Sequence, residues 1–403
     1  MKILHTADWH LGKKLDHFSR LHEQKQVLEE LIEIVETQDI DIVVIAGDLF
    51  DNFNPNTEAI ELFYKTVKQL ANDGKRPVIA IAGNHDAPNL IDAPNPLAKE
   101  CGIILIGHPN TKIPLLKLPY FEISKSDYGF IEIKHHKYAY PIRIIHTPYA
   151  NEIRLKQYFG ENKEDGLNET LAQSWQQLAN TYCDNNGVNL LTAHLYINKR
   201  GEIIEEPDGE KPIKVGNADM IYADSIPNQM QYTALGHLHG YRNIGSEEKP
   251  IVYSSSILPY SFSEAGQTKY AVVIDLEPNN IPVLNKIPLQ SGRTLYRKTF
   301  HSIEESLEWL NNNQNCLVEI TLKLTSYLRT EDRKAIYQSH DGIIHLIPSM
   351  KAEATDAKPL KSIDLNKNMI NLFEEYFKTK HQNLELNDDL KQLFKEISNA
   401  EEK

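Results

Sequence analysis

The chain has 403 residues, of which 41% are hydrophobic and 25% charged, so its composition is that of a globular protein with two or three domains and excludes a disordered or collagen-like chain. Three widely spaced cysteines form no Cys-x-x-Cys pair and predict neither a disulfide framework nor a thiolate zinc site. The 43 basic and 56 acidic residues give a net charge of −13, which argues against nucleic acid unless a metal site, a local basic strip or a partner subunit reverses the sign locally.

The first part of the chain, residues 1–277, alternates short apolar runs with helical patterns. The runs at 42–46 and 77–82 are typical of strands that are buried on both faces. Between and after them, 24–36 and 57–72 carry apolar side chains at helical spacing. The order strand, helix, strand, helix, strand predicts an α/β domain.

The second part, residues 278–350, has the pattern of a small α/β domain. We expect strands near 293–299, 316–324 and 342–347, and helices near 302–312 and 331–339. Residues 351–359 lack large apolar side chains, which is typical of a linker, and we place the linker at 351–361. Residues 362–403 predict two short amphipathic helices, which either pack back on their own domain or dock a partner.

The apolar runs are far shorter than the roughly 20 residues that a membrane helix needs. The first eight residues become polar too soon for a signal peptide. We therefore expect an unexported cytoplasmic protein that does not enter a membrane.

Five short motifs follow apolar strand-like runs: Asp8-Trp9-His10, Gly47-Asp48, Gly83-Asn84-His85-Asp86, Ala193-His194 and Gly236-His237-Leu238-His239. Because the carboxyl ends of strands in α/β sheets gather ligand groups, these distant segments can converge on one pocket. Carboxylate, imidazole and amide oxygen donors suit manganese, iron or zinc. Alternation along an extended chain would send both residues of each Asp-x-His or His-x-His pair to one side, and Asp48 could bridge two ions.

Any one of these histidines alone would more often be structural. The joint occurrence of seven potential ligands at five strand ends favours a metal centre, and we expect the other eleven of the 16 histidines, His85 excepted, to be structural. Three basic segments could contact a polyanion or be solvated surface: Lys13-Lys14, Lys134 to Lys137 and Lys199-Arg200.

In this order the motifs resemble those of the calcineurin-like metallophosphoesterases, and in particular the SbcD-type nuclease subunits. The segments that carry the resemblance are Met1-Lys-Ile-Leu-His-Thr-Ala-Asp-Trp-His-Leu-Gly-Lys13, Ala46-Gly-Asp-Leu-Phe-Asp51, Ala82-Gly-Asn-His-Asp86, Tyr232-Thr-Ala-Leu-Gly-His-Leu-His239 and Leu258-Pro-Tyr-Ser-Phe-Ser-Glu264. The resemblance implies a layered αββα sandwich over 1–277, a small α/β capping domain and a C-terminal helical pair that binds an ATPase partner.

The resemblance also implies roles for individual residues. One metal would be held by Asp8, His10 and His239, the other by Asn84, His194 and His237, with Asp48 between them and manganese as the typical metal. His85 would stabilise the transition state or protonate the leaving oxygen, and Asp86 would orient His85. Two positions depart from related patterns without touching a ligand: Asp51, where archaeal and eukaryotic relatives carry histidine, and Ser255, where glycine is usual.

The function that the resemblance implies is a metal-dependent DNA nuclease, a double-strand exonuclease and single-strand or hairpin endonuclease in DNA repair, recombination and replication. It would work as a homodimer within a heterotetramer with the SMC-like coiled-coil ATPase SbcC. Two alternatives stay open at this stage. A phosphatase or small-substrate phosphodiesterase could use the same two-metal centre, and a catalytically dead scaffold could keep the fold.

Overall fold

A computed structural model describes residues 1–159, 163–202, 220–324 and 326–350, together with residues 373, 374, 377, 390 and 391. Met1–Ser349 form one compact unit and Met350–Lys403 a second. The domain boundary predicted at residue 277 falls within the first unit. The predicted linker at 351–361 and most of the predicted helical pair lie outside the described residues.

Two β-sheets form the first part of the chain. The six-stranded sheet has the order β18 (Val283–Pro288), β17 (Tyr270–Asp275), β1 (Lys2–Thr6), β4 (Ile42–Ala46), β5 (Val78–Ile81) and β6 (Ile103–Ile106). The eight-stranded sheet has the order β15 (Arg242–Asn243), β16 (Ile251–Tyr253), β14 (Tyr232–Gly236), β11 (Val188–His194), β10 (Ile142–Thr147), β9 (Phe130–His135), β8 (Phe121–Asp127) and β7 (Leu116–Lys117). Both sheets are mixed. The eight-stranded sheet has a parallel centre and antiparallel edges, whereas the six-stranded sheet is antiparallel only at β17 and β18 and parallel from β1 to β6.

The inner faces of the two sheets pack against each other. Alternate residues of the strands, such as Ile42 and Val44 in one sheet and Ile142 and Ile144 in the other, form one buried apolar cluster. Because successive side chains of a strand point to opposite faces, the other residues of the same strands face outward and need a second cover. This requirement explains why the predicted runs at 42–46 and 77–82 are apolar throughout.

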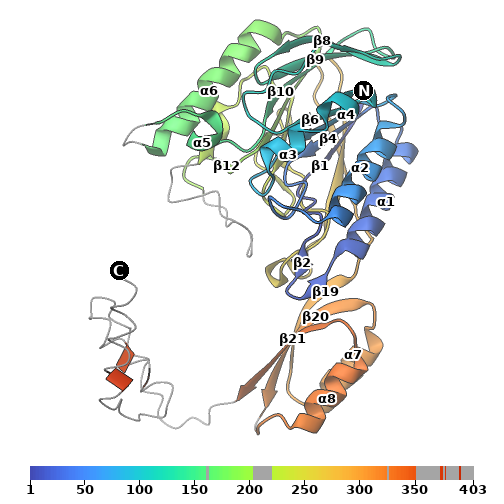
Figure 1. Cartoon of the computed structure of the whole chain (residues 1–403), viewed down its shortest axis with the longest axis vertical. Coiled ribbons are helices and arrows are strands. Elements are labelled where there is room, and N and C mark those ends of the chain that lie inside the picture. The colour runs from blue at the N-terminus through green and yellow to red at the C-terminus, as the bar shows by residue number, and fades with distance from the viewer. Residues whose placement is uncertain are drawn as a thin grey trace. The chain divides into compact units, whose positions relative to one another are not determined.

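Helices supply that cover on both outer faces (Figure 1). Helices α1 (Leu21–Thr37), α2 (Thr57–Ala71), α3 (Pro88–Asp92) and α4 (Asn95–Glu100) pack on the six-stranded sheet. Helix α6 (Lys163–Tyr182) packs on the eight-stranded sheet, and the short α5 (Glu152–Leu155) precedes it. The predicted αββα sandwich is therefore confirmed, and helix α1 begins a turn earlier than the apolar pattern indicated.

The strand directions bring five loops together. Parallel β1, β4 and β5 end at the same edge of their sheet, and parallel β11 and β14 end side by side in the other, with His194 opposite Gly236. The two edges coincide because β4 contacts both β11 and β14 across the sandwich. Each predicted motif lies in or directly after one of these five strands.

The elements of residues 294–350, which we call the second domain as a name for this part of the chain, follow the predicted pattern closely. Strands β19 (Thr294–Phe300), β20 (Cys316–Leu324) and β21 (Ile343–Met350) form one sheet, which helices α7 (Ile303–Asn312) and α8 (Thr330–Ser339) cover. A small apolar cluster joins this domain to the first one. It contains Leu295, Leu317 and Ile344 on one side and, on the other, Leu15 from the hairpin β2 (Lys14–Leu15) and β3 (Phe18–Ser19) and Phe262 from the 3-10 turn η2 (Phe262–Glu264).

Three further short elements complete the described fold: β12 (Ile197–Asn198) pairs with β13 (Ile221–Tyr222), which the 3-10 turn η1 (Ala223–Ser225) follows. Within the described residues, every helix is too short or too polar to cross a lipid bilayer.

Candidate metal centre

The loops that carry the predicted ligands are tightly turned rather than extended. Asp8 and His10 have backbone φ angles of 53° and 45°, Asp48 has 46° and His237 has 101°. These values lie in the left-handed region, which residues other than glycine rarely adopt. The prediction that strand alternation aligns Asp8 with His10 is therefore wrong, because the chain leaves the strand before Asp8 and turns both side chains inward by local backbone strain.

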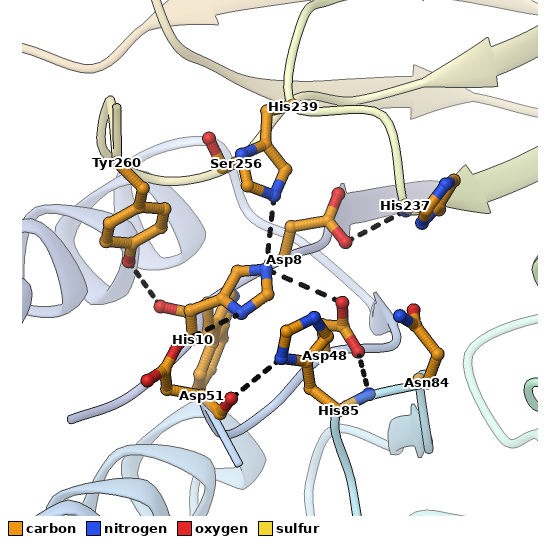
Figure 2. A network of polar contacts seen from close by, with 12 residues as sticks. Asp8, His10, Asp48, Asp51, Asn84, His85, His237, His239, Ser256 and Tyr260 are labelled. Carbon is orange, nitrogen blue, oxygen red and sulfur yellow. Dashed lines mark hydrogen bonds and ion pairs between the residues drawn. The ribbon is translucent and has the colours of Figure 1, made fainter. Parts of the chain in front are cut away.

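One group of ligand atoms surrounds His10. Its Nε2 lies 3.1 Å from Nε2 of His239 and 3.5 Å from Oδ2 of Asp48. Figure 2 shows the two imidazoles and the Asp48 carboxylate directed at one another from three separate loops. All three side chains are buried, so their atoms form a preformed set of donors that water does not separate.

A second group surrounds His194. Its Nε2 lies 2.9 Å from Oδ1 of Asn84 and 3.4 Å from the same Asp48 Oδ2. Its Nδ1 donates a hydrogen bond to the Ala46 carbonyl at 2.9 Å. Since a carbonyl can only accept, Nδ1 carries a proton, and Nε2 is the nitrogen directed at the group. The His237 ring packs edge-on against His194, with 5.7 Å between the ring centroids.

Asp8 lies with the second group: one oxygen of its carboxylate, one of Asp48 and a ring nitrogen of His194 fall within 4.8 Å of one another. Oδ1 of Asp8 accepts a hydrogen bond from the backbone N–H of His237 at 2.9 Å and lies 3.7 Å from Nδ1 of His194. Its Oδ2 is buried without a hydrogen-bond partner among the described residues. Burial raises the pKa of Asp8 to about 6, although the neighbouring histidines lower it. A buried carboxylate oxygen without a partner is the kind of atom that a cation would satisfy.

The electrostatics of the centre also favour positive charge. Burial alone would raise the pKa of Asp48, but the imidazoles of His194 and His10 hold it well below its usual range. Conversely, burial lowers the pKa of His194 while Asp48 and Asp8 raise it, to a net value of about 9. In the absence of an ion, a proton on His194 therefore supplies charge that a divalent cation would bring. The residues present thus fit a two-metal centre.

His85 lies beside this centre without belonging to either group. Its backbone N–H donates to Oδ1 of Asp48 at 2.9 Å, and its Nδ1 donates to the backbone carbonyl of Asp51 at 2.7 Å. The ring stands edge-on to His10, with 5.0 Å between the centroids (Figure 2). The hydrogen bond of Nδ1 to this carbonyl fixes the orientation of the ring.

Asp86 contacts backbone N–H groups rather than His85. Its carboxylate accepts hydrogen bonds from the backbone N–H groups of Leu49, Phe50 and Gly83, at 3.0, 2.9 and 2.7 Å. It thereby ties the loop after β4 to the loop after β5. Burial, followed by the nearby Asp48 charge, raises the pKa of Asp86 to about 6. The prediction that Asp86 orients His85 is wrong, because the Asp51 carbonyl orients that ring.

Three residues near the centre had no role in the sequence prediction. Asp51 lies with His10 and His85, one potential ligand atom of each within 4.8 Å of the others, and pairs with Lys13 at 3.1 Å. Arg154 donates to the carbonyls of Gly83 and Asp86 at 2.9 and 2.8 Å. Glu264 lies 3.1 Å from Nδ1 of His239. Only Asp51 and Glu264 had a signal, since both fall within segments that carry the resemblance.

The three predicted basic segments lie in different places. Lys137 pairs with Asp41, which precedes β4, so it lies at the end of the sandwich opposite to Asp48. Lys13 is mostly buried against Asp51, whereas Lys14 is exposed. Arg200 is exposed and pairs with Asp224 at 2.7 Å. The segment from Lys134 to Lys137 is therefore a poor candidate for contact with a substrate at the centre.

The chain is similar in sequence to proteins of one known family. Residues 1–241 match the calcineurin-like phosphoesterase family. The SbcD subunit of the nuclease SbcCD from Bacillus subtilis (strain 168) is 33% identical over 369 residues, which cover 90% of this chain and 89% of that protein. Its namesake from Staphylococcus epidermidis (strain ATCC 12228 / FDA PCI 1200) is 32% identical over 73% of this chain and 71% of its own length.

Among solved structures, a dimetal phosphatase from Danio rerio overlays with a TM-score of 0.40 and 10% identity, over 72% of this chain and 98% of that chain. The match to the Bacillus subtilis protein covers too much of the chain to end at residue 241, so the similarity extends into the second domain.

Proposed function

Because the chain belongs to the calcineurin-like phosphoesterase family and, within it, to the SbcD-type nuclease subunits, we propose that it is the DNA-cleaving subunit of an SbcCD-type complex. The chain is a phosphodiester hydrolase and a metal-dependent nuclease. In the proposal it acts as an exonuclease on duplex ends and as an endonuclease on single strands and hairpins, in the cytoplasm, during DNA repair, recombination and replication.

The observation that supports the proposal is that His10 and His194 both approach one oxygen of Asp48, with His239 beside His10 and Asn84 beside His194. We assign Asp8, His10 and His239 to one divalent ion and Asn84, His194 and His237 to the other, with Asp48 shared. Manganese fits the mixture of carboxylate, amide and imidazole donors. When bound, such a pair of ions supplies an acidified water and neutralises the phosphate charge for in-line attack.

The chain's own residues supply the remaining steps. His85 would hold a proton on Nε2 and deliver it to the departing oxygen, since its Nδ1–H is fixed on the Asp51 carbonyl. The Asp48 carboxylate accepts a hydrogen bond from the backbone N–H of His85. The position of His85 therefore depends on the position of Asp48. Asp86 keeps the loops after β4 and β5 from separating, and Arg154 ties the second of these loops to α5.

The proposed partners are DNA and a coiled-coil ATPase of the SbcC type, in a complex with two copies of this chain. The second unit would contact the ATPase. Its few described residues include Phe373 and Phe377, whose ring centroids lie 6.4 Å apart, and a Glu374–Lys391 ion pair of 2.8 Å. This pair joins residues of the two segments in which helices are predicted, as expected of helices that pack together.

A labelled DNA hairpin tests the proposal. The purified chain, with and without its ATPase partner, should cleave the hairpin only when manganese is present. The same preparation should turn over cyclic AMP and a phosphomonoester far more slowly. Rapid turnover of either small substrate together with an intact hairpin would instead identify a small-substrate phosphoesterase.

A further inference from the structure

A buried carboxylate from η2 stands directly behind one of the proposed ligands. Oε1 of Glu264 accepts hydrogen bonds from Nδ1 of His239 at 3.1 Å and from the backbone N–H of Tyr260 at 3.2 Å. Its Oε2 accepts from Nζ of Lys269, and the same ammonium donates to the His239 carbonyl at 2.8 Å. Glu264 is only 2% exposed and Lys269 only 4%, so water cannot replace these contacts.

This arrangement determines which nitrogen of His239 is available. A carboxylate without a proton only accepts hydrogen bonds, so Nδ1 of His239 carries the proton. The lone pair is then on Nε2, the atom that lies 3.1 Å from His10 Nε2. Outer partners of this kind orient metal-binding histidines and raise their basicity. A buried ion pair adds little net stability, so the position of this one beside His239 points to a role in orientation.

The same turn contacts the second domain. Phe262, two residues before Glu264, packs with Leu295, Leu317 and Ile344 of that domain, and its ring centroid lies 5.6 Å from that of His345. Lys269, the partner of Glu264, accepts the backbone N–H of Leu289 on its carbonyl, close to where the chain enters the second domain. Phe262, which contacts the second domain, and Glu264, which accepts the hydrogen bond from His239, therefore lie in the same turn, and Lys269 links Glu264 to Leu289, just before the second domain.

From these contacts we propose that Glu264 is the positioning residue of His239 and that the second domain acts on the metal centre through the turn Phe262–Glu264. This inference rests on the proposed function, since it assumes that His239 binds an ion. Displacement of Phe262 would move Glu264 and rotate His239 away from His10, and one ion would be held less tightly.

Manganese binding by calorimetry tests the role of Glu264. The double variant E264L/K269M removes both charges and keeps the side-chain volumes, so it should fold. We expect it to bind the ion assigned to His239 about 10- to 100-fold less tightly than the unsubstituted chain does. With a chromogenic phosphodiester at subsaturating manganese, kcat should fall while KM for the ester stays constant, and saturating manganese should restore kcat. E132Q is the matched control, because Glu132 is an equally buried carboxylate, paired with Arg143 at 3.0 Å.

The link to the second domain needs its own pair of variants. F262A should weaken manganese binding, whereas L310A, which opens a cavity in the core of the second domain, should lower thermal stability without changing the affinity. F262L serves the same purpose if F262A does not fold. Equal manganese affinity for the unsubstituted chain, F262A and E264L/K269M would overturn the inference. Failure of the unsubstituted chain to bind manganese would overturn the proposed function instead.

Discussion

At the scale of single residues, the proton on His85 is the feature most open to test. Replacing His85 with Asn removes Nε2 but leaves the side chains of all seven proposed ligands in place. We expect manganese binding to persist and kcat to fall about 10²- to 10⁴-fold, the usual contribution of a general acid. His108→Asn is the control, since His108 lies outside both groups of ligand atoms. Turnover near that of the unsubstituted chain would remove His85 from the mechanism.

Two glycines that flank the last histidine motif offer a second test. A Cβ atom at Gly236 would lie 1.8 Å from the Ala46 carbonyl oxygen, whereas one at Gly240 would meet nothing closer than 3.9 Å. G236A should therefore destabilise the chain by about 3 kcal/mol or more and separate β14 from β4. G240A should change the unfolding free energy by less than about 0.5 kcal/mol. Urea unfolding of both variants measures the contrast, and equal stabilities would contradict the close approach of the sheets.

That the five motifs come together was predictable from sequence because each follows an apolar run. The way in which the side chains converge was not. Left-handed backbone at Asp8, His10 and Asp48 was not predictable, because Asp and His adopt it more often than other non-glycine residues but adopt extended or helical backbone far more often still. The partner of His85 was also missed, because it is a backbone carbonyl, which every residue carries.

At the scale of elements, the inner faces of β1 and β10 each bury a histidine, in accord with the expectation of structural roles. His5 contacts the Tyr232 hydroxyl at 2.8 Å and the Leu235 carbonyl at 3.2 Å. His146 has neither ring nitrogen in a hydrogen bond within the described part of the chain. Burial lowers the pKa of both side chains from 6.5 to about 3.

These shifts predict a pH dependence with a definite sign. Both histidines stay neutral in the folded chain but take up a proton in the unfolded chain below pH 6.5, so their stabilising contribution is complete above 6.5 and is lost as the pH falls toward 3. Between about pH 6.5 and 3, the unfolding free energy falls as the pH falls. In H146L this slope should be shallower by about 1.4 kcal/mol per pH unit in the middle of the range. Urea titrations of the metal-free protein at several pH values give this slope.

The comparison of H5L with H146L separates protonation from hydrogen bonding. Both variants should show the shallower pH slope. At pH 7, however, H5L should lose about 1–3 kcal/mol because it strands the Tyr232 hydroxyl and the Leu235 carbonyl, while H146L should be neutral or more stable. An unchanged slope for H146L would mean that this histidine is charged in the folded protein.

Helices and strands were predictable where a single period dominates. The second domain matched to within three residues at each boundary because each element has one apolar face against one core. The eight-stranded sheet was harder to predict. Its edge strands, such as β7 with two residues and β15 with two, are too short to produce a pattern, and pairing between β10 and β11 joins residues that are more than forty positions apart.

At the scale of the whole molecule, the two compact units predict separable functions. Met1–Ser349 contains every proposed ligand and the residues that position them. Deleting residues after 360 should therefore leave manganese-dependent cleavage of a hairpin by the isolated chain within about twofold and abolish association with the ATPase partner. Co-purification with the tagged ATPase measures the second effect. Association that survives the deletion would place the partner's contact on the first unit.

The net charge of −13 makes the position of each lysine matter for DNA binding, because the molecule as a whole repels a polyanion. Lys14 is exposed next to Lys13, which pairs with Asp51 beside the metal centre, and Lys137 is engaged by Asp41 at the opposite end of the sandwich.

K14A should weaken DNA binding and reduce the slope of log K against log salt by about 0.9 in magnitude, the effect of one lost phosphate contact. K137A should change neither quantity, because DNA at the centre does not reach it. Fluorescence anisotropy from 50 to 200 mM salt, about the range over which such contacts are screened, measures both slopes. A loss of affinity in K137A equal to that in K14A would mean that DNA also binds the far end of the sandwich.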